Sequence, residues 1–358
     1  MTRLEHYNYH PPKGLIATKP AAPRDSARLF VYHTETDTVT FDTFRNIAQY
    51  LPHPSLLVFN DTKVVPARLW LTKETGGKIE VLLMMNEYRT HDILLKGIVD
   101  RKIAIGSTLF FKSGAELKVV KQDEQFFFFE PSVTMPLLWK LMEQEGTTPI
   151  PPYIKDTTLS ERVLREKYQS VFARERASVA APTASLHFTE KLIAALAKKS
   201  IAHTEVTLHV GMGTFAPITN KHIAEKKLFT EYYAITEKSA HTINEAKASQ
   251  VPVIAVGTTA MRTLESAVQR QSLDTPKTAF GQVTASAGAT NIFIYPPYDF
   301  QIASGLVTNF HVPKSSLMLL VAAFLKHKKA KRDILALYDI AIREKFRFYS
   351  FGDGMLIL

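Results

Sequence analysis

Residues 55–61 read SLLVFND, a short run that is apolar at almost every position before it ends in polar residues. A strand that is covered on both faces needs apolar side chains throughout, so this run predicts a buried strand of an α/β sheet. Asn60, Asp61 and Thr62 then supply groups that favour a turn and can bind a ligand. We therefore expect an α/β fold with polar residues where this strand ends.

The pattern changes after this strand, because residues 63–148 contain short, closely spaced strand candidates separated by glycines. The candidates read ARLWLTK, KIEVLLMMNE, DILLKGIV, STLFFK, ELKVVKQ and QFFFFE, and a helical pattern returns only with PLLWKLMEQ. Six short strands with turns between them predict a small β-barrel. The phenylalanines at 126–129 are interpreted as a core strand rather than as a platform for stacking bases.

Strand and helix candidates alternate on both sides of this region. The helix candidates read FDTFRNIAQYL (41–51), FTEKLIAALAKK (188–199, capped by Thr189) and AMRTLESAV (260–268), and the strand candidates read RLFVYH (28–33), HTEVTLHV (203–210) and VPVIAVGTT (251–259). The proline-rich PIPPYIK (149–155) is a stiff return connection. We predict a mixed α/β fold, with a large α/β catalytic domain formed by residues 1–62 and 149–358 and an inserted six-stranded antiparallel β-barrel at 63–148.

A candidate site lies at residues 306–324, LVTNFHVPKSSLMLLVAAF. Asn309 and His311 follow a strand-like segment, and Lys314 precedes an apolar run with helical spacing. We place Pro313 in the first helical turn, where its missing N–H is tolerated. The segment predicts polar groups at the entrance of a helix.

Composition narrows the classes of function. The chain has 358 residues, a formal net charge of +10 and no cysteine, which excludes disulfides, thiol nucleophiles and thiolate metal sites. A net positive charge favours a polyanionic partner, although a merely basic soluble protein would look the same. No signal peptide or apolar run long enough for a membrane span is evident, so we expect a cytoplasmic protein without membrane contact. No metal-binding or nucleotide-binding motif requires a metal.

Three further segments carry polar residues beside small ones. His187 follows AAPTAS near a helix start, Gly211 and Gly213 follow a strand that ends at His209, and Thr258, Thr259 and Arg262 open a helix after a buried strand. Each has a structural alternative: His187 as a core hydrogen-bonding group, the threonines as helix caps, and Arg262 as a surface cation. One composite pocket around Asn60, His187, His209 and His311 explains the clusters more economically.

The order of motifs resembles a known family. The motifs read LLVFNDTKVVPARL, TGGKIEVLL, PIPPYIK, YQSVFARERASVAAPTASLHFTE, TLHVGMGTFAPI, VGTTAMRTLES, NIFIYPPYDF, LVTNFHVPKSSLMLLVAAF and FRFYSFGDGMLI. In order and spacing they are similar to the S-adenosylmethionine:tRNA ribosyltransferase-isomerase family of queuosine biosynthesis, across nearly the whole chain. The family's fold, an α/β domain with an inserted six-stranded barrel, is similar to the layout described above.

The resemblance implies an enzyme that moves and isomerises the ribosyl part of S-adenosylmethionine onto 7-aminomethyl-7-deazaguanine at the tRNA wobble position. Epoxyqueuosine forms, and adenine and methionine are released. S-adenosylmethionine is then a co-substrate, with no true cofactor and no metal, and the protein is a monomer or a weak homo-oligomer. A base must remove a ribose C5′ proton that the neighbouring sulfonium acidifies.

Roles for individual residues follow from the resemblance. The candidate catalytic residues are His187, His209, His311 and Glu231. The candidate substrate-binding residues are Asn60, Arg68, Thr183, Gly211, Gly213, Thr258, Thr259, Arg262, Asn309 and Asp353. Arg174, Arg176, Lys314 and Arg347 are candidates for contacts with tRNA phosphates.

Five positions depart from the family pattern: Ala216, Phe229, Ala289, Pro297 and Ser304 stand where arginine, histidine, tryptophan, glycine and aspartate are usual. These changes equally fit a divergent branch of the family with the same reaction. Two alternatives to the family activity stay open. One, motivated by these changes, is a paralogous enzyme of the same fold that acts on another nucleoside or small molecule. The other is a non-catalytic protein that binds RNA through the barrel and a basic surface.

Overall fold

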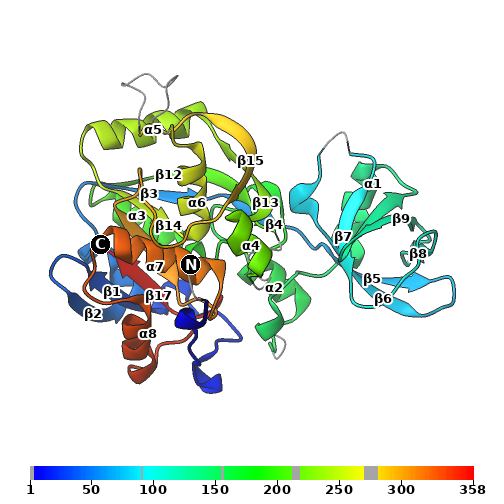
Figure 1. The fold of residues 1–358 in the computed structure, drawn as a ribbon, viewed down its shortest axis with the longest axis horizontal. Coiled ribbons are helices and arrows are strands. Elements are labelled where there is room, and N and C mark those ends of the chain that lie inside the picture. The colour runs from blue at the N-terminus through cyan, green and yellow to red at the C-terminus, as the bar shows by residue number, and fades with distance from the viewer. Residues whose placement is uncertain (1–3, 90–91, 155–156, 212–217, 270–280) are drawn as a thin grey trace.

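The computed structural model describes residues 4–89, 92–154, 157–211, 218–269 and 281–358. It contains a large mixed sheet and, beside it, a closed barrel (Figure 1). The fold class predicted from the sequence is confirmed, including the six antiparallel strands of the barrel. Within the described residues, every helix is too short or too polar to cross a membrane.

The large sheet has nine strands in the order β15-β13-β12-β3-β14-β16-β17-β1-β2. Their bounds are β1 Arg28–His33, β2 Thr38–Thr43, β3 Ser55–Asn60, β12 Ile201–His209, β13 Lys227–Ile235, β14 Val253–Val256, β15 Ser286–Ile292, β16 Gly305–Asn309 and β17 Gly354–Ile357. Four central neighbours, β12, β3, β14 and β16, run parallel. Their carboxyl ends therefore meet at one edge of the sheet.

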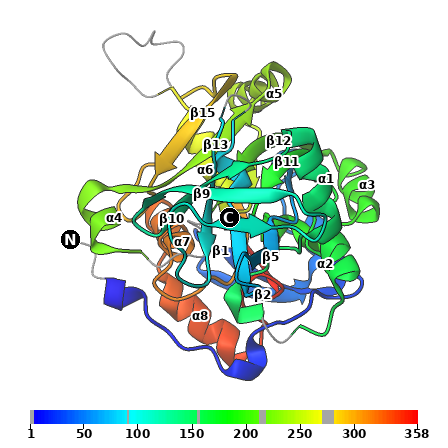
Figure 2. The same ribbon diagram turned by 90° about the vertical axis from the view of Figure 1, so that its right-hand side faces the viewer.

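Helices cover both faces of this sheet, which explains why β3 is buried at all six positions. Leu56 and Val58 of β3 join a core with the helices α5 to α8, whereas Leu57 and Phe59 join a second core on the side of α3. Viewed from the barrel, α7 and α8 lie on one side of the sheet and α3 on the other (Figure 2). The helix bounds here are α3 Glu190–Ala197, α4 Asn220–Glu225, α5 Glu237–Ala248, α6 Thr258–Ala267, α7 Ser316–His327 and α8 Ile334–Arg343.

The barrel closes in the order β10-β7-β6-β5-β8-β9 around its own apolar core. Its strands are β5 Arg68–Lys73, β6 Lys78–Leu83, β7 Leu95–Val99, β8 Thr108–Phe110, β9 Glu116–Asp123 and β10 Phe126–Pro131. The helix α1 (Met135–Glu145) packs Leu138, Leu141 and Met142 into this core. Phe127 and Phe129 are buried in the same core, so the run at 126–129 is a core strand as predicted.

Short elements connect the two parts of the molecule. A small parallel sheet of β4 (Thr62–Val64) and β11 (Glu175–Ser178) lies beside α2 (Glu161–Lys167) and the 3-10 turn η6 (Pro152–Ile154). The 3-10 turn η5 (Met85–Glu87), which follows the barrel strand β6, contacts β13 and β11. The remaining 3-10 turns are η1 Leu4–Tyr7, η2 Lys13–Leu15, η3 Arg24–Ser26, η4 Phe44–Gln49 and η7 Thr183–His187.

Two local predictions were wrong. The predicted helix at 41–51 is a strand end followed by the 3-10 turn η4, because pairing of β2 with β1 extends to Thr43. Pro313 lies before α7 rather than in its first turn, because Ser315 caps the helix by accepting a hydrogen bond from the Met318 N–H, so α7 begins at Ser316.

Candidate active site

A cavity of about 50 Å³ that opens to solvent lies where β14 and β16 end. Its walls come from η7, the first residues of α6, the segment between β16 and α7, and the C-terminal segment near Tyr349. The carboxyl ends of parallel strands are the usual ligand-binding edge of an α/β sheet. The lining residues are Tyr153, Tyr168, Ala181, Pro182, Thr183, Ala184, Val210, Gly257, Thr258, Thr259, Thr308, Asn309, Phe310, His311, Val312, Ser315, Leu317, Tyr349 and Ser350.

Five of the residues proposed from the sequence line this cavity together: Thr183, Thr258, Thr259, Asn309 and His311. They come from three segments that lie far apart in the chain. The tertiary fold brings these segments together because η7 packs on β16, and β16 pairs with β14 just before α6.

The helix α6 begins with Gly257 as its N-cap and has no side-chain cap. Gly257 has φ +91° and ψ 153°, a conformation open essentially to glycine alone. The alternative that Thr258 or Thr259 caps α6 is therefore wrong. Both side chains are instead available to the cavity.

Two buried polar atoms on the cavity wall have no hydrogen-bond partner among the described residues. They are Thr259 Oγ1 and Asn309 Oδ1. Leaving a buried polar group unpaired costs about 1–3 kcal/mol. Their common position on one cavity indicates a polar ligand that would supply the missing partners.

His311 is held tightly at the cavity wall. The ring Nε2 lies 2.7 Å from Thr308 Oγ1. The backbone N–H donates to the Tyr338 hydroxyl at 2.9 Å, and the backbone carbonyl accepts from the Tyr9 hydroxyl. Burial lowers the pKa of His311 to about 3. The imidazole is therefore neutral at physiological pH.

His187 lies behind the cavity wall rather than on it. Its Nε2 is 3.4 Å from Asn309 Nδ2, and its ring lies 4.7 Å from the ring of Phe44. Burial lowers the pKa of His187 to about 4, partly opposed by the charge of Asp353. His187 thus reaches the cavity through Asn309, which also donates to the Tyr349 carbonyl at 3.2 Å.

Asn60 and His209 lie at the same edge of the sheet but outside the cavity lining. Asn60 joins β3 to β12, because its Nδ2 donates to the Leu208 carbonyl at 3.0 Å and its Oδ1 accepts from the Leu208 and Thr62 N–H groups. His209 Nδ1 lies 2.9 Å from Thr62 Oγ1. Burial, followed by the charge of Arg89, lowers the pKa of His209. Of the four residues around which one composite pocket was expected, only His311 lines the cavity.

Glu231 and Arg262 form a buried ion pair one helical turn from Thr258. Arg262 Nη1 donates to Glu231 Oε2, and Glu231 Oε1 accepts from the Gly211 N–H at 2.8 Å. The alternative that Arg262 is a surface cation is wrong, since its side chain is only 7% exposed. Gly213, proposed beside Gly211, lies outside the described residues, as does Ala216.

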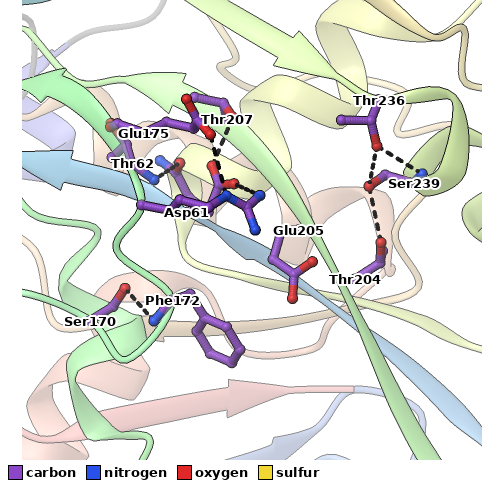
Figure 3. Close-up of polar contacts among 12 residues, drawn as sticks. Asp61, Thr62, Ser170, Phe172, Glu175, Thr204, Glu205, Thr207, Thr236 and Ser239 are labelled. Atoms are coloured by element: carbon purple, nitrogen blue, oxygen red, sulfur yellow. Dashed lines mark hydrogen bonds and ion pairs between the residues drawn. The ribbon is translucent and has the colours of Figure 1, made fainter.

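The cations proposed for phosphate contacts are all engaged with carboxylates. Arg174 pairs with Asp61 at 2.6 Å, Arg176 with Glu143, Lys314 with Glu5 at 2.8 Å and Arg347 with Asp353 at 2.9 Å. Figure 3 shows Asp61 beside Thr207, whose hydroxyl donates to it at 2.7 Å. Burial raises the pKa of Asp61 despite this hydrogen bond and the charge of Arg174.

Asp353 and Arg68, proposed to bind substrate, lie away from the cavity lining. Buried Asp353 accepts from the N–H groups of Arg28 and Arg347 and from the Arg347 guanidinium, so it ties the C-terminal segment to β1. Arg68 pairs with Glu80 on the neighbouring barrel strand. Both interactions hold local structure.

Four described positions that depart from the family pattern also lie outside the cavity lining. Phe229 packs against His222 and the barrel residue Phe126, Ala289 pairs with Tyr232 in the sheet, and Ser304 Oγ donates to the Val253 carbonyl. The peptide bond that joins Pro296 to Pro297 is cis.

Sequence reasoning missed the aromatic part of the cavity, formed by Tyr153, Tyr168 and Tyr349. The Tyr153 hydroxyl lies 2.7 Å from Ser350 Oγ, and burial raises the pKa of Tyr153 to about 12. All three tyrosines lie in motifs that carried the family resemblance. Within the described residues, no group of three or more His, Asp or Glu side chains is arranged to hold a metal.

Comparison with known proteins assigns the chain to a family. A family model described as "Queuosine biosynthesis protein" matches residues 4–357. The chain is 41% identical to the S-adenosylmethionine:tRNA ribosyltransferase-isomerase of Carboxydothermus hydrogenoformans, over 99% of this chain and 100% of that one, and 42% identical to that of Moorella thermoacetica, with the same coverage. The crystal structure of S-adenosylmethionine tRNA ribosyltransferase from Thermotoga maritima aligns with a TM-score of 0.52 and 30% identity, over 98% of this chain and 99% of that one. The chain therefore belongs to the queuosine biosynthesis protein family.

Proposed function

We propose that this protein is an S-adenosylmethionine:tRNA ribosyltransferase-isomerase. It transfers the ribosyl part of S-adenosylmethionine to 7-aminomethyl-7-deazaguanine at the tRNA wobble position, giving epoxyqueuosine tRNA, adenine and methionine. Full-length similarity to relatives of that name supports the activity. The observation that links the proposal to particular residues is the cavity wall on which Asn309 and Thr259 leave polar atoms unpaired.

The cavity suits the adenosyl part of the co-substrate. Tyr153, Tyr168 and Tyr349 offer aromatic surface to a flat base, and the unpaired Asn309 Oδ1 can accept a hydrogen bond from an exocyclic amine. Thr258 and Thr259 lie where α6 begins. Their hydroxyls can meet ribose hydroxyls.

Within this proposal His311 is the base, because it lines the cavity and is neutral at physiological pH. It accepts the ribose C5′ proton that the adjacent sulfonium acidifies. The resulting imidazolium then returns this proton to the departing adenine. His187 acts through Asn309 as a positioning residue.

The remaining assignments extend the same proposal. Arg174 and Arg176, which are about half exposed or more, contact tRNA phosphates by exchanging their carboxylate partners for the RNA.

Residues 63–148 form an inserted domain. The protein acts in the cytoplasm as a monomer or a weak homo-oligomer.

One assay tests the activity. The protein is incubated with S-adenosylmethionine and tRNA that carries 7-aminomethyl-7-deazaguanine, and free adenine and epoxyqueuosine are quantified. We expect both products in equal amounts. Adenine without tRNA modification would point to a different acceptor, and RNA binding without adenine release would point to a non-catalytic RNA-binding protein.

Variants test the assignment of the base. His311→Gln should abolish adenine release, whereas His203→Gln should retain it, because His203 lies on β12 outside the cavity lining and pairs with Glu205. Retention of normal turnover by His311→Gln would refute His311 as the base while leaving the overall activity intact.

A further inference from the structure

A second set of unpaired polar atoms surrounds the Glu231–Arg262 ion pair. Arg262 uses Nη1 to bind Glu231, while its Nε and Nη2 have no hydrogen-bond partner within the described part of the chain. These two atoms form one edge of the guanidinium plane. That edge binds two oxygen atoms of a carboxylate side by side.

The barrel contributes to the same place through Asn86 in η5. Asn86 is 1% exposed, and neither its Oδ1 nor its Nδ2 has a partner among the described residues. A Cβ at Gly211 would collide with the Asn86 amide, so this amide lies directly against the backbone that donates to Glu231. The two groups next to the Glu231 carboxylate, Gly211 and Arg262, thus adjoin or carry four unpaired atoms, two of Asn86 and two of Arg262.

The charge of the surroundings favours an anionic group. Glu231 and Arg262 balance each other, while Arg89, from the segment after η5, stacks on Tyr232 and also leaves Nη2 unpaired within the described ranges. His209, whose pKa is lowered, adds no charge at neutral pH. Arg89 therefore adds a further guanidinium with an unpaired donor beside the strand that carries Glu231.

We propose that this site binds the amino-acid end of S-adenosylmethionine, an inference that rests on the proposed function. The carboxylate pairs with Arg262 Nε and Nη2, and the ammonium group donates to Asn86 Oδ1 near the negative charge of Glu231. The adenosyl part occupies the neighbouring cavity. Thr258 and Arg262 are four residues apart on α6, about 6 Å along its axis, which is a distance that the methionyl chain can span.

The acceptor base fits this site less well. The edge of guanine that an arginine usually recognises presents O6 and N7, but in a 7-deazaguanine the N7 position is carbon. That base offers one acceptor to a guanidinium edge that has two donors. A carboxylate offers two.

The test compares two ligands by calorimetry: S-adenosylmethionine and its decarboxylated analogue. The wild-type protein should bind S-adenosylmethionine about 10- to 100-fold more tightly, as expected for a charge-assisted pair. Arg262→Lys keeps the charge opposite Glu231 but removes the paired donors, so the preference should fall to about threefold or less. Arg332→Lys, on a surface arginine that pairs with Asp37, is the matched control and should keep the full preference.

Asn86→Ala provides a second variant that leaves the buried ion pair intact. It should weaken binding of S-adenosylmethionine about tenfold while leaving binding of methylthioadenosine, which lacks the amino-acid end, unchanged. The assignment of this site to the amino-acid end would be overturned if the wild-type protein bound S-adenosylmethionine and its decarboxylated analogue equally well. It would also be overturned if Arg262→Lys weakened the binding of both ligands equally. Neither result would contradict the proposed function. Absence of S-adenosylmethionine binding to the wild-type protein would overturn both.

Discussion

His311 and His187 should make the stability of the folded protein depend on pH in a way that a single substitution can reveal. Both are buried in the neutral form, and burial lowers their pKa values to about 3 and about 4 from an ordinary value of 6.5. Below pH 6.5 these two histidines bind protons in the unfolded chain but not in the folded protein. The free energy of unfolding should therefore fall as pH falls through this window.

The size of the effect follows from the pKa values. A pH of 5 is about 1.5 units below the pKa of each histidine in the unfolded chain, and it is still above the pKa of each in the folded protein. At about 1.4 kcal/mol per unit, each contributes a loss of about 2 kcal/mol between pH 7 and pH 5. The pair should cost about 4 kcal/mol over that range, and the loss should continue to about pH 4 for His187 and about pH 3 for His311.

The substitution that isolates one of them is His311→Gln, whose amide can keep a hydrogen bond to Thr308. Urea unfolding is measured from pH 7 to pH 5 for the wild-type protein, for this variant and for His10→Gln, which changes an exposed histidine. The His311 variant should lose about 2 kcal/mol less than the wild type, and the His10 variant should follow the wild type. Parallel loss in all three proteins would refute the neutral, buried state of His311.

Three further substitutions test the cavity and the site beside it. Tyr168→Phe removes a buried hydroxyl of the cavity lining, so the free energy of unfolding in urea should fall by no more than about 1 kcal/mol, while S-adenosylmethionine binding weakens about tenfold; unchanged binding would contradict the ligand contact. Gly211→Ala should lower the free energy of unfolding by about 1–3 kcal/mol, because its Cβ meets the Asn86 amide, whereas Gly288→Ala, with its nearest atoms at 3.6 Å, should not. Asn309→Ala should reduce adenine release at least tenfold in a single-turnover assay, since charge-free hydrogen bonds of about 1–1.5 kcal/mol are lost on both sides of the amide; normal turnover would exclude Asn309 from the site.

Local patterns predicted most elements because each element buries a recognisable face. The apolar run of β3 indicated burial on both sides, and the alternation from 203 to 210 indicated a strand that ends at a polar residue. The two wrong predictions concern where a helix begins, which depends on the capping residue in one case and on strand pairing in the other. Ser315 rather than Pro313 sets the start of α7, and the pairing of β2 with β1 shortens the expected helix at 41–51 to a 3-10 turn.

Residue type alone could not say which polar side chains face a ligand. Asn60 and Asn309 both follow buried parallel strands, yet the amide of Asn60 is used between β3 and β12, while Asn309 leaves an oxygen unpaired in the cavity. Likewise, the sequence left Arg262 open between a substrate-binding residue and a surface cation, and only β13 places Glu231 against it. The tyrosines of the cavity were missed because an aromatic residue in an ordinary core has the same sequence pattern.

The amino-acid sequence by itself determined the α/β class, the six-stranded barrel and membership of the family, since periodicity, turn residues and ordered motifs are properties of contiguous segments. Only the tertiary structure decided that Thr183, Thr259, Asn309 and His311 share one cavity, and that the Asn86 amide lies against Gly211, whose N–H binds Glu231. The physical reason is that strand order and the docking of η5 on β13 set which segments meet. Whether a buried polar atom finds a partner depends on that meeting, not on its neighbours in the chain.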